Sequence, residues 1–166
     1  MSGILQGRTA IVTGAGGGLG AAHARVFASE GCAVVVNDIN TEAAQAVVDS
    51  ITAAGGRAIV NSSDITHYDD SLNAVKQAID SFGGLDIVLN NAGINRDRMF
   101  ASMTEAEWDA IMAVHLKGHF CISSHAVHYW RGLSKEGKAV DARIINTTSG
   151  AGLQGYRADF GLQAAI

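Results

Sequence analysis

A run of closely spaced glycines near the amino end of the chain is the first pattern that could do chemistry. Glycine lacks a side chain, so the backbone can turn sharply and bring its N–H groups close to a phosphate. A helix that starts inside such a run adds unpaired N–H groups and the positive end of its dipole. The segment TGAGGGLG therefore predicts a diphosphate site formed by Gly14, Gly16, Gly17, Gly18, Leu19 and Gly20. A flexible turn is the alternative interpretation.

One acidic residue indicates which dinucleotide the predicted site would bind. Asp38 follows the apolar segment AVVVN, at a place where a carboxylate can accept hydrogen bonds from the hydroxyl groups of a ribose. The same carboxylate would repel a 2′-phosphate, so the pattern favours NAD over NADP as the cofactor. No Gly-Lys-Ser/Thr sequence follows the glycines, which excludes a P-loop nucleoside triphosphatase.

Apolar segments rich in β-branched residues alternate with segments of helical periodicity. Strands are expected at 9–14, 33–38, 57–64, 85–93 and 143–150, and helices at 19–31, 41–54, from 66 and from 104. This alternation predicts a parallel sheet with right-handed crossovers, whereas an eight-stranded barrel needs ~200 residues or more. The expected fold is α/β, a doubly wound, Rossmann-like parallel sheet in a single domain, 1–166. A ligand is expected where the strand order reverses, at the carboxyl ends of the first and fourth strands.

Local patterns add detail to this scheme. Thr66 with Asp69, and Thr104 with Glu107, have the spacing of a capping box at a helix start. The helix after Thr104 is expected to turn one stripe of side chains inward, namely Trp108, Ile111, Met112 and His115. Residues 132–142, GLSKEGKAVDA, are typical of a polar surface loop.

Four motifs, which follow one another along the chain in the family's order, resemble those of the short-chain dehydrogenase/reductase family. TGAGGGLG is similar to its cofactor signature, and NNAG, with Asn91, Ala92 and Gly93, to its second signature. Asp64 and Ile65 fall where the family contacts adenine, and IINTTSGAG matches the strand that carries its active-site serine. Within the family, INRDRMF and VHLKGHF look most like 3-oxoacyl reductases and hydroxyacyl-CoA dehydrogenase domains.

The resemblance implies hydride transfer between a nicotinamide cofactor and a secondary alcohol or ketone. The family's serine orients the substrate oxygen and corresponds to Ser149, and where the family has a water-holding asparagine this chain has His115. From the residues alone, Ser149 could instead end a strand and His115 could be a core histidine. His115 and His119 have i, i+4 spacing, but no cysteine or carboxylate stands at ligand spacing beside them, so we expect no metal.

The end of the chain departs from the family pattern, in which a tyrosine transfers the proton and a lysine four residues later lowers the pKa of that tyrosine and holds the ribose. In ADFGLQAAI, Phe160 takes the place of the tyrosine and Gln163 comes nearest to the lysine. Tyr156 stands only seven residues after Ser149, and no lysine follows Lys138. Phenylalanine has no hydroxyl group, and loss of a positioned acid typically costs ~10²–10⁴-fold in rate. We therefore expect a sheet that is incomplete at its C-terminal edge and a lost proton-transfer pair.

Composition excludes several function classes. Hydrophobic residues make up 48% of the chain and the net charge is −4, with no run of Lys or Arg, which argues against a nucleic-acid or anionic membrane partner. No apolar segment approaches ~20 residues, and no signal peptide is visible at the start, so we expect a cytoplasmic protein. Cys32 and Cys121 are far apart in the sequence and are expected to be reduced thiols.

Three hypotheses follow from these patterns. The first is an NAD(H)-dependent oxidoreductase with a small-molecule substrate, such as a 3-hydroxyacyl or 3-oxoacyl thioester. The second is a non-catalytic NAD-binding or interaction module, and the third is an inactive, truncated remnant. In each case the exposed fifth strand invites a second copy, as a homo-oligomer, or a partner that completes the sheet.

Overall fold

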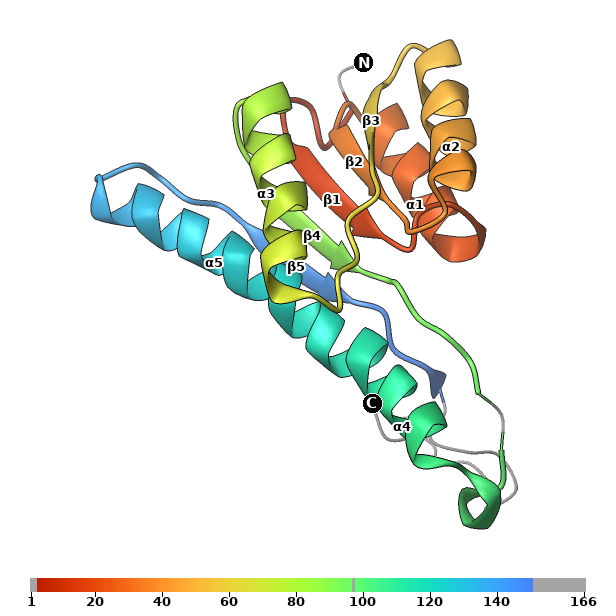
Figure 1. The fold of residues 1–166 in the computed structure, drawn as a ribbon. Helices are drawn as coiled ribbons and strands as arrows, with labels where there is room; N and C mark the ends of the chain where they lie inside the picture. Colours follow the sequence, from red (N-terminus) through yellow and green to blue (C-terminus); the bar gives the residue numbers. More distant parts are fainter. Residues whose placement is uncertain (1–2, 97, 151–166) are drawn as a thin grey trace.

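The computed structural model describes residues 3–96 and 98–150, which form a twisted sheet with helices on both faces (Figure 1). The strands are β1 (Thr9–Thr13), β2 (Ala33–Asn37), β3 (Arg57–Asn61), β4 (Ile87–Asn90) and β5 (Arg143–Asn146). The helices are α1 (Gly18–Ser29), α2 (Thr41–Ala53), α3 (Tyr68–Phe82), α4 (Glu105–Met112) and α5 (His119–Lys135). A 3₁₀ turn, η1 (Phe100–Ser102), precedes α4, and a π-helical segment, η2 (Ala113–Gly118), joins α4 to α5.

The sheet has the order β3-β2-β1-β4-β5, and every strand pair is parallel. The chain moves outward from β1 to β3, returns to the other side of β1 with β4, and continues to β5. The strand order therefore reverses between β1 and β4, which is the usual place for a ligand in such folds. The predicted doubly wound parallel sheet is confirmed.

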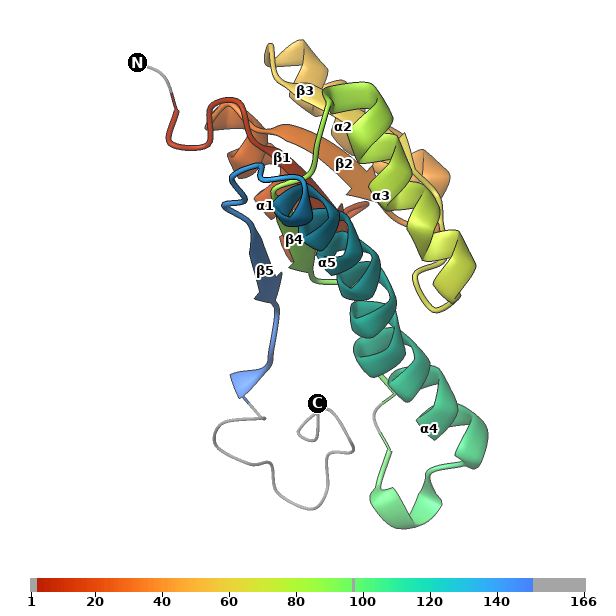
Figure 2. The same cartoon turned by 90° about the vertical axis from the view of Figure 1, so that its left-hand side faces the viewer.

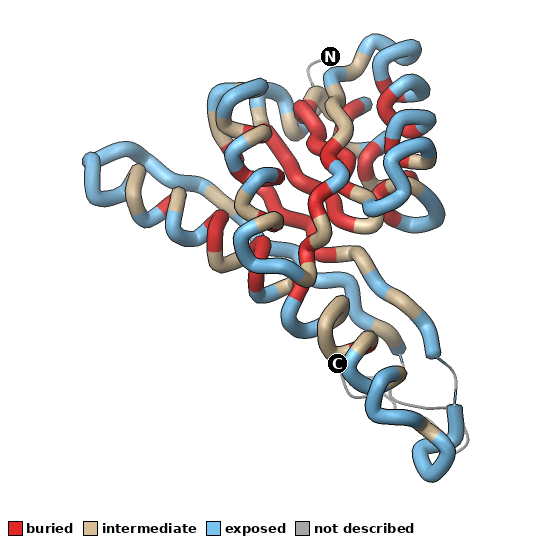
Figure 3. The backbone as a smooth tube through the Cα atoms, in the orientation of Figure 1, coloured by how far each residue is buried: buried red, intermediate tan, exposed pale blue. Residues whose placement is uncertain are grey.

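Side chains of the central strands alternate between two separate cores, as the pleat of a strand requires. Ile11 and Val35 point into the core under α3 and α5, whereas Val12, Val34 and Val36 point into the core under α1 and α2. All five are fully buried, and Figure 3 shows burial concentrated along the central strands. Burial of both faces explains why these strands are almost continuously apolar.

Of the two capping boxes predicted at helix starts, one is confirmed and the other is wrong. Thr104 caps α4 in a complete capping box, with Glu107 N donating to Thr104 Oγ1 at 3.2 Å. The box predicted at Thr66 is wrong, because α3 begins at Tyr68. The Thr66 hydroxyl donates to Asp64 Oδ1 at 2.7 Å instead, so a bond to a nearer acceptor competes with the cap.

Helices α4 and α5, with η2 between them, form one rod that projects well beyond the sheet (Figure 2). The expected inner stripe is only partly correct, since Ile111 is buried but Trp108 is 38% exposed. The loop predicted from residue 132 starts later, because α5 continues to Lys135. Trp130 holds this end of α5 to the sheet by donating from Nε1 to Leu85 O at 2.7 Å.

Strand β5 lies at the edge of the described sheet and all four of its residues are exposed. Its start is held by charge: Arg8 bridges Asp86 at 3.1 Å and also Asp141, while Arg143 bridges Asp141 at 2.6 Å. These groups lie at the amino ends of β1, β4 and β5. Among the helices of the described ranges, none is long and apolar enough to cross a membrane.

Candidate active site

The turn from β1 into α1 depends on glycines at two kinds of position. Gly14 and Gly18 have φ of +62° and +52°, a backbone conformation that favours glycine. Gly20 is required by close packing, because a Cβ there would lie 2.2 Å from the carbonyl oxygen of Gly14. The first turn of α1 therefore rests directly against the backbone that leaves β1.

Asp38 is fixed in orientation by two backbone N–H groups. Gly16 N donates to Asp38 Oδ2 at 2.9 Å, and Asn40 N donates to Asp38 Oδ1 at 2.9 Å. A Cβ on Gly16 would come within 2.8 Å of the same carboxylate oxygen. The glycine loop and the acid that follows β2 are thus one bonded unit, although the two lie far apart in the sequence.

The start of α1 faces open space. Gly17 is the N-cap and has no side chain to cap the helix, and a Cβ built on Gly17 or Gly18 would meet no described atom within 4 Å. Leu19 is 66% exposed. Uncapped N–H groups at the positive end of a helix of twelve residues are suited to bind an anion. The residues present therefore fit a dinucleotide diphosphate.

A cavity of about 270 Å³ continues from this loop along the carboxyl ends of the strands. It is lined by Gly14, Asn37, Asp38, Ile39, Ser63, Asp64, Ile65, Thr66, Ala92, Gly93, Ile94 and Val114. Six of the residues predicted to bind the cofactor thus share one cavity: Gly14, Asp38, Asp64, Ile65, Ala92 and Gly93. Asn91 lies beside it and lines a neighbouring cavity.

Asp64 is held by its own neighbours. Thr66 donates to Asp64 Oδ1 from its backbone N at 2.8 Å and from its hydroxyl at 2.7 Å, and His67 Nδ1 lies 3.2 Å from Oδ2. Burial opposes the charged form, but the hydrogen bonds from Thr66 outweigh it and the pKa of Asp64 lies below its usual value. The carboxylate is therefore an ionised part of a rigid cavity wall.

Thr13, which the sequence analysis did not single out, positions the NNAG segment. Its buried hydroxyl accepts hydrogen bonds from Asn91 N at 3.0 Å and Ala92 N at 3.1 Å. Asn91 Nδ2 in turn donates to Thr13 O at 3.1 Å. A threonine directly before a glycine-rich turn was visible in the sequence, but nothing local indicated its partner 78 residues away.

Asn90, the first residue of the NNAG segment, links β4 to β5 and to α5, which the sequence analysis did not predict. Its Nδ2 donates to Asn146 Oδ1 at 2.8 Å and to Ser123 Oγ at 2.9 Å. The side chain is fully buried, and Oδ1 has no hydrogen-bond partner within the described part of the chain. Asn90 thereby ties together the carboxyl ends of two strands beside the site.

Ser149 and His115, the predicted catalytic residues, line the same small cavity of about 150 Å³. Its other walls are Asn91, Ala92, Ile111, Thr147 and Thr148. The two residues come from different elements, because Ser149 follows β5 by three residues and His115 belongs to η2. Their shared cavity adjoins the larger one through Ala92.

The two imidazoles of η2 and α5 contact the backbone after β4. His115 Nε2 lies 2.8 Å from Ile94 O and 3.0 Å from Ile94 N, while His119 Nε2 lies 3.4 Å from Ala92 O. Burial lowers the pKa of His119, and the neighbouring His115 lowers it further. No group of three or more His, Cys, Asp or Glu side chains is placed to hold a metal ion among residues 3–96 and 98–150.

Tyr156, Phe160 and Gln163, on which the prediction of a lost proton-transfer pair depends, lie outside the described residues. Both cysteines lie inside them and are free thiols in the core. Burial raises the pKa of Cys32 to about 12, so this thiol is protonated and unreactive at neutral pH.

Comparison with known proteins gives a consistent result. The family model described as short chain dehydrogenase matches residues 8–160. Hydroxyacyl-CoA dehydrogenase ChsB1 of Mycobacterium tuberculosis is 47% identical over 158 residues, which cover 91% of this chain and 50% of that protein. Peroxisomal multifunctional enzyme type 2 of Mus musculus is 40% identical over 159 residues, covering 90% of this chain and 20% of that protein.

A solved structure shows the same relationship. The crystal structure of a short chain dehydrogenase from Mycobacterium avium is 55% identical and superposes with a TM-score of 0.94, over 98% of this chain and 59% of that one. This chain thus spans about half the length of the M. tuberculosis relative and a smaller share of the mouse relative.

Proposed function

This chain belongs to the short-chain dehydrogenase family, and we propose that it binds NAD(H) for hydride transfer on a 3-hydroxyacyl or 3-oxoacyl thioester. The observation that carries the proposal is the bonded unit of Gly16 and Asp38 at the point where the strand order reverses. It combines a fixed carboxylate with a loop of exposed backbone. Both are needed to hold a nucleotide by its ribose and its diphosphate.

The role of each part follows from its chemistry. The N–H groups at the start of α1 would hold the diphosphate, and Asp38 would accept hydrogen bonds from the ribose hydroxyls. When bound, NAD supplies the hydride acceptor. A 2′-phosphate on that ribose would meet a carboxylate held in place by two N–H groups, which supports NAD rather than NADP.

The small cavity beside this site supports the substrate class. Ser149 and His115 both line it, and a hydroxyl group and an imidazole can orient the oxygen of an alcohol or ketone. The M. tuberculosis relative is a hydroxyacyl-CoA dehydrogenase by name. We assign Ser149 to orientation of the substrate oxygen and place the substrate next to Asn91 and Thr147.

A second candidate function is nucleotide binding without turnover. Phe160 at the position of the family's tyrosine favours it, because its ring carries no proton to transfer. The two candidates share the nucleotide site and differ only in the chemical step. Binding and turnover must therefore be measured separately.

Calorimetry of this chain with NAD, NADH and NADP tests the shared part. We expect NAD(H) to bind at least ~10-fold more tightly than NADP, and Asp38→Asn to remove most of that difference. Asp49→Asn, which changes an exposed carboxylate on the far side of α2, serves as the matched control and should change nothing. Absence of NAD(H) binding would reject both candidates.

Turnover is followed by the absorbance of NADH with 3-oxoacyl-CoA thioesters of several chain lengths. Oxidation of NADH above the rate without protein supports the oxidoreductase, and Ser149→Ala should lower that rate ~100-fold. Tight NAD(H) binding with no turnover would instead support the non-catalytic module.

A further inference from the structure

One side-chain atom, His115 Nε2, lies within hydrogen-bond distance of both backbone groups of a single residue. It is 2.8 Å from Ile94 O and 3.0 Å from Ile94 N. With a proton on Nε2 the ring donates to the carbonyl oxygen, and without one it accepts from the N–H. The contact to Ile94 therefore persists in either tautomer of the ring.

The residue before Ile94 is a glycine because of this ring. The three atoms nearest to a Cβ on Gly93 would all belong to His115, the closest being Cε1 at 2.8 Å. Gly93 is not among the glycines with positive φ, so its backbone would accept an L-residue. The edge of the imidazole formed by Cε1 and the two nitrogens thus lies where a side chain at position 93 would stand.

Segment 93–94 follows Ala92, the residue that lines both cavities. Gly93 and Ile94 line the nucleotide cavity together with Val114, whereas the adjacent His115 lines the small cavity with Ser149. The π-helical segment η2 carries both Val114 and His115. π-Helical segments recur at functional sites, where they change the direction of side chains relative to an α-helix. The imidazole, which lines the small cavity, thus contacts two residues of the wall of the nucleotide cavity.

We propose that His115 is a positioning residue for the nucleotide: it fixes segment 93–94, and through it the wall of the cavity in which NAD(H) binds. The inference rests on the proposed function for its ligand. It differs from the catalytic role expected from the sequence, because the imidazole acts on the nucleotide through the backbone. Removal of the ring should therefore weaken nucleotide binding before any chemistry occurs.

A double-mutant cycle on His115 and Gly93 tests this arrangement. His115→Ala should raise the Kd for NADH about tenfold, and Gly93→Ala by a similar factor, because the new methyl group displaces the ring. In the double variant the ring is absent and the methyl group has room. Adding Gly93→Ala to His115→Ala should therefore raise the Kd for NADH by less than a factor of two. Independent effects, which multiply to about a hundredfold, would overturn the proposal.

Thermal unfolding without nucleotide gives a second, independent measure of the same coupling. Gly93→Ala should lower Tm by about 3 °C in the otherwise unchanged chain and by less than 1 °C in the His115→Ala background. His115→Gln, which keeps a donor and an acceptor, should recover part of the NADH affinity. His128→Gln, on an exposed turn of α5, is the control and should leave both measurements unchanged.

The two measurements separate the two proposals. If the unchanged chain fails to bind NADH, the proposed function fails, and the coupling in Tm still decides whether His115 fixes segment 93–94. If NADH binds but neither Kd nor Tm shows coupling, the positioning role is wrong and the proposed function stands. Coupling in Tm without coupling in Kd would also overturn the role, because the wall would then not affect the ligand.

Discussion

The turn between β1 and α1 and the strand β5 lie in the same sheet and are built in opposite ways. At the turn, Gly20 packs against the backbone of Gly14, and the backbone N–H of Gly16 donates to the carboxylate of Asp38. In β5 every residue is exposed, and the strand is held by its ladder with β4 and by surface charges. The geometry of the first region is enforced by sterics, whereas that of the second depends on a few polar contacts.

The two regions should therefore differ in how strongly nucleotide binding depends on them. In the β1–α1–β2 region the described residues cover both faces of the sheet, and the carboxylate of Asp38 is already held in one orientation. The β5 region brings Ser149 to the small cavity and leaves Ile144 and Ile145 about 40% exposed, at 39% and 41%. Nucleotide binding should therefore tolerate changes in β5 far better than changes around β1.

The largest expected effect compares two isoleucines of the same sheet. Ile11→Ala removes a fully buried side chain between α3 and α5 and should lower the free energy of unfolding by ~2–5 kcal/mol. Ile145→Ala, at the exposed edge, should change it by no more than ~0.5 kcal/mol. Urea unfolding followed by circular dichroism measures both. Equal losses would show that β5 is packed as tightly as β1.

A smaller effect compares two glycines of the turn. Gly20→Ala places a methyl group 2.2 Å from the Gly14 carbonyl oxygen and should destabilise the chain by ~1–3 kcal/mol through overpacking. Gly17→Ser adds a side chain in open space at the N-cap, where serine is favoured. The free energy of unfolding of this variant should stay the same or rise slightly. A tolerated Gly20→Ala would contradict the steric account of the turn.

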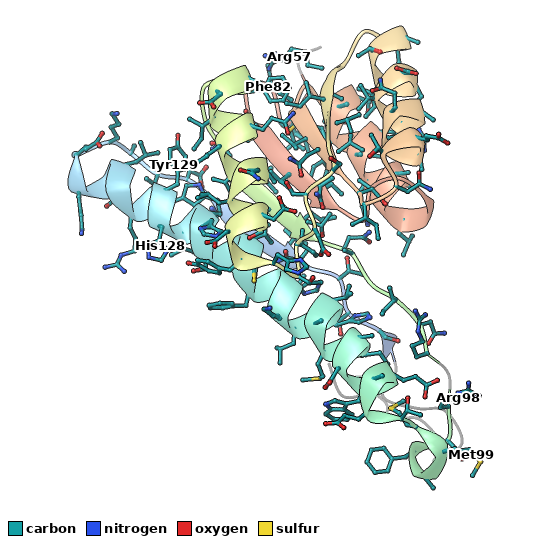
Figure 4. All side chains as sticks on the ribbon, viewed as in Figure 1. Arg57, Phe82, Arg98, Met99, His128 and Tyr129 are labelled. Carbon is teal, nitrogen blue, oxygen red and sulfur yellow. The ribbon has the colours of Figure 1, made fainter. Side chains whose placement is uncertain are left out.

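The smallest effect concerns a charge at the end of the projecting rod, far from the turn. Hydrogen bonds from Thr104 and then from Arg98 lower the pKa of Glu107 to about 2, and Figure 4 shows Arg98 beside the far end of α4. Because the pKa of Glu107 is depressed in the folded state, ionised Glu107 stabilises the fold at pH values above its ordinary pKa of about 4.5. This stabilisation disappears as the pH falls toward about 2.

Carboxyl NMR titration measures this pKa directly. Arg98→Gln should raise it toward the ordinary value, because the Arg98 Nε–Glu107 Oε1 contact of 2.9 Å is lost. Lys138→Gln, which removes a surface ion pair elsewhere, is the control. An unchanged midpoint in Arg98→Gln would mean that the capping box alone sets the pKa of Glu107.

The sequence was most informative where the determinant is local. The capping box of Thr104 and Glu107 depends on residues three apart and was predicted correctly, and the alternating β–α pattern led to the correct sheet. The strand predicted at 85–93 is shorter, Ile87–Asn90, and helix α5 continues to Lys135, although a loop was predicted from residue 132. Helix ends depend on tertiary contacts such as that of Trp130 with Leu85, which the periodicity of one segment does not contain.

The site was predicted in part for the same reason. Glycine spacing and the position of Asp38 pointed to one site, and six of the twelve residues predicted to bind the cofactor line one cavity. Their role in binding stays a prediction, as do the roles of Ser149 and His115. Thr13 was missed because its partners are distant in sequence, and η2 was missed because a π-helical insertion leaves no simple pattern in the residues themselves.

The charged cluster of Arg8, Asp86 and Asp141 lies at the amino ends of the strands, whereas both cavities lie at the carboxyl ends. Strand β5 is thus secured by charge at the end away from the cavities. A second tie, the hydrogen bond between Asn90 and Asn146, holds this strand at its carboxyl end. Mutations around the cavities that spare this pair therefore leave both ends of the strand attached. A scaffold of this kind can acquire new substrate preferences over evolutionary time while its architecture stays constant.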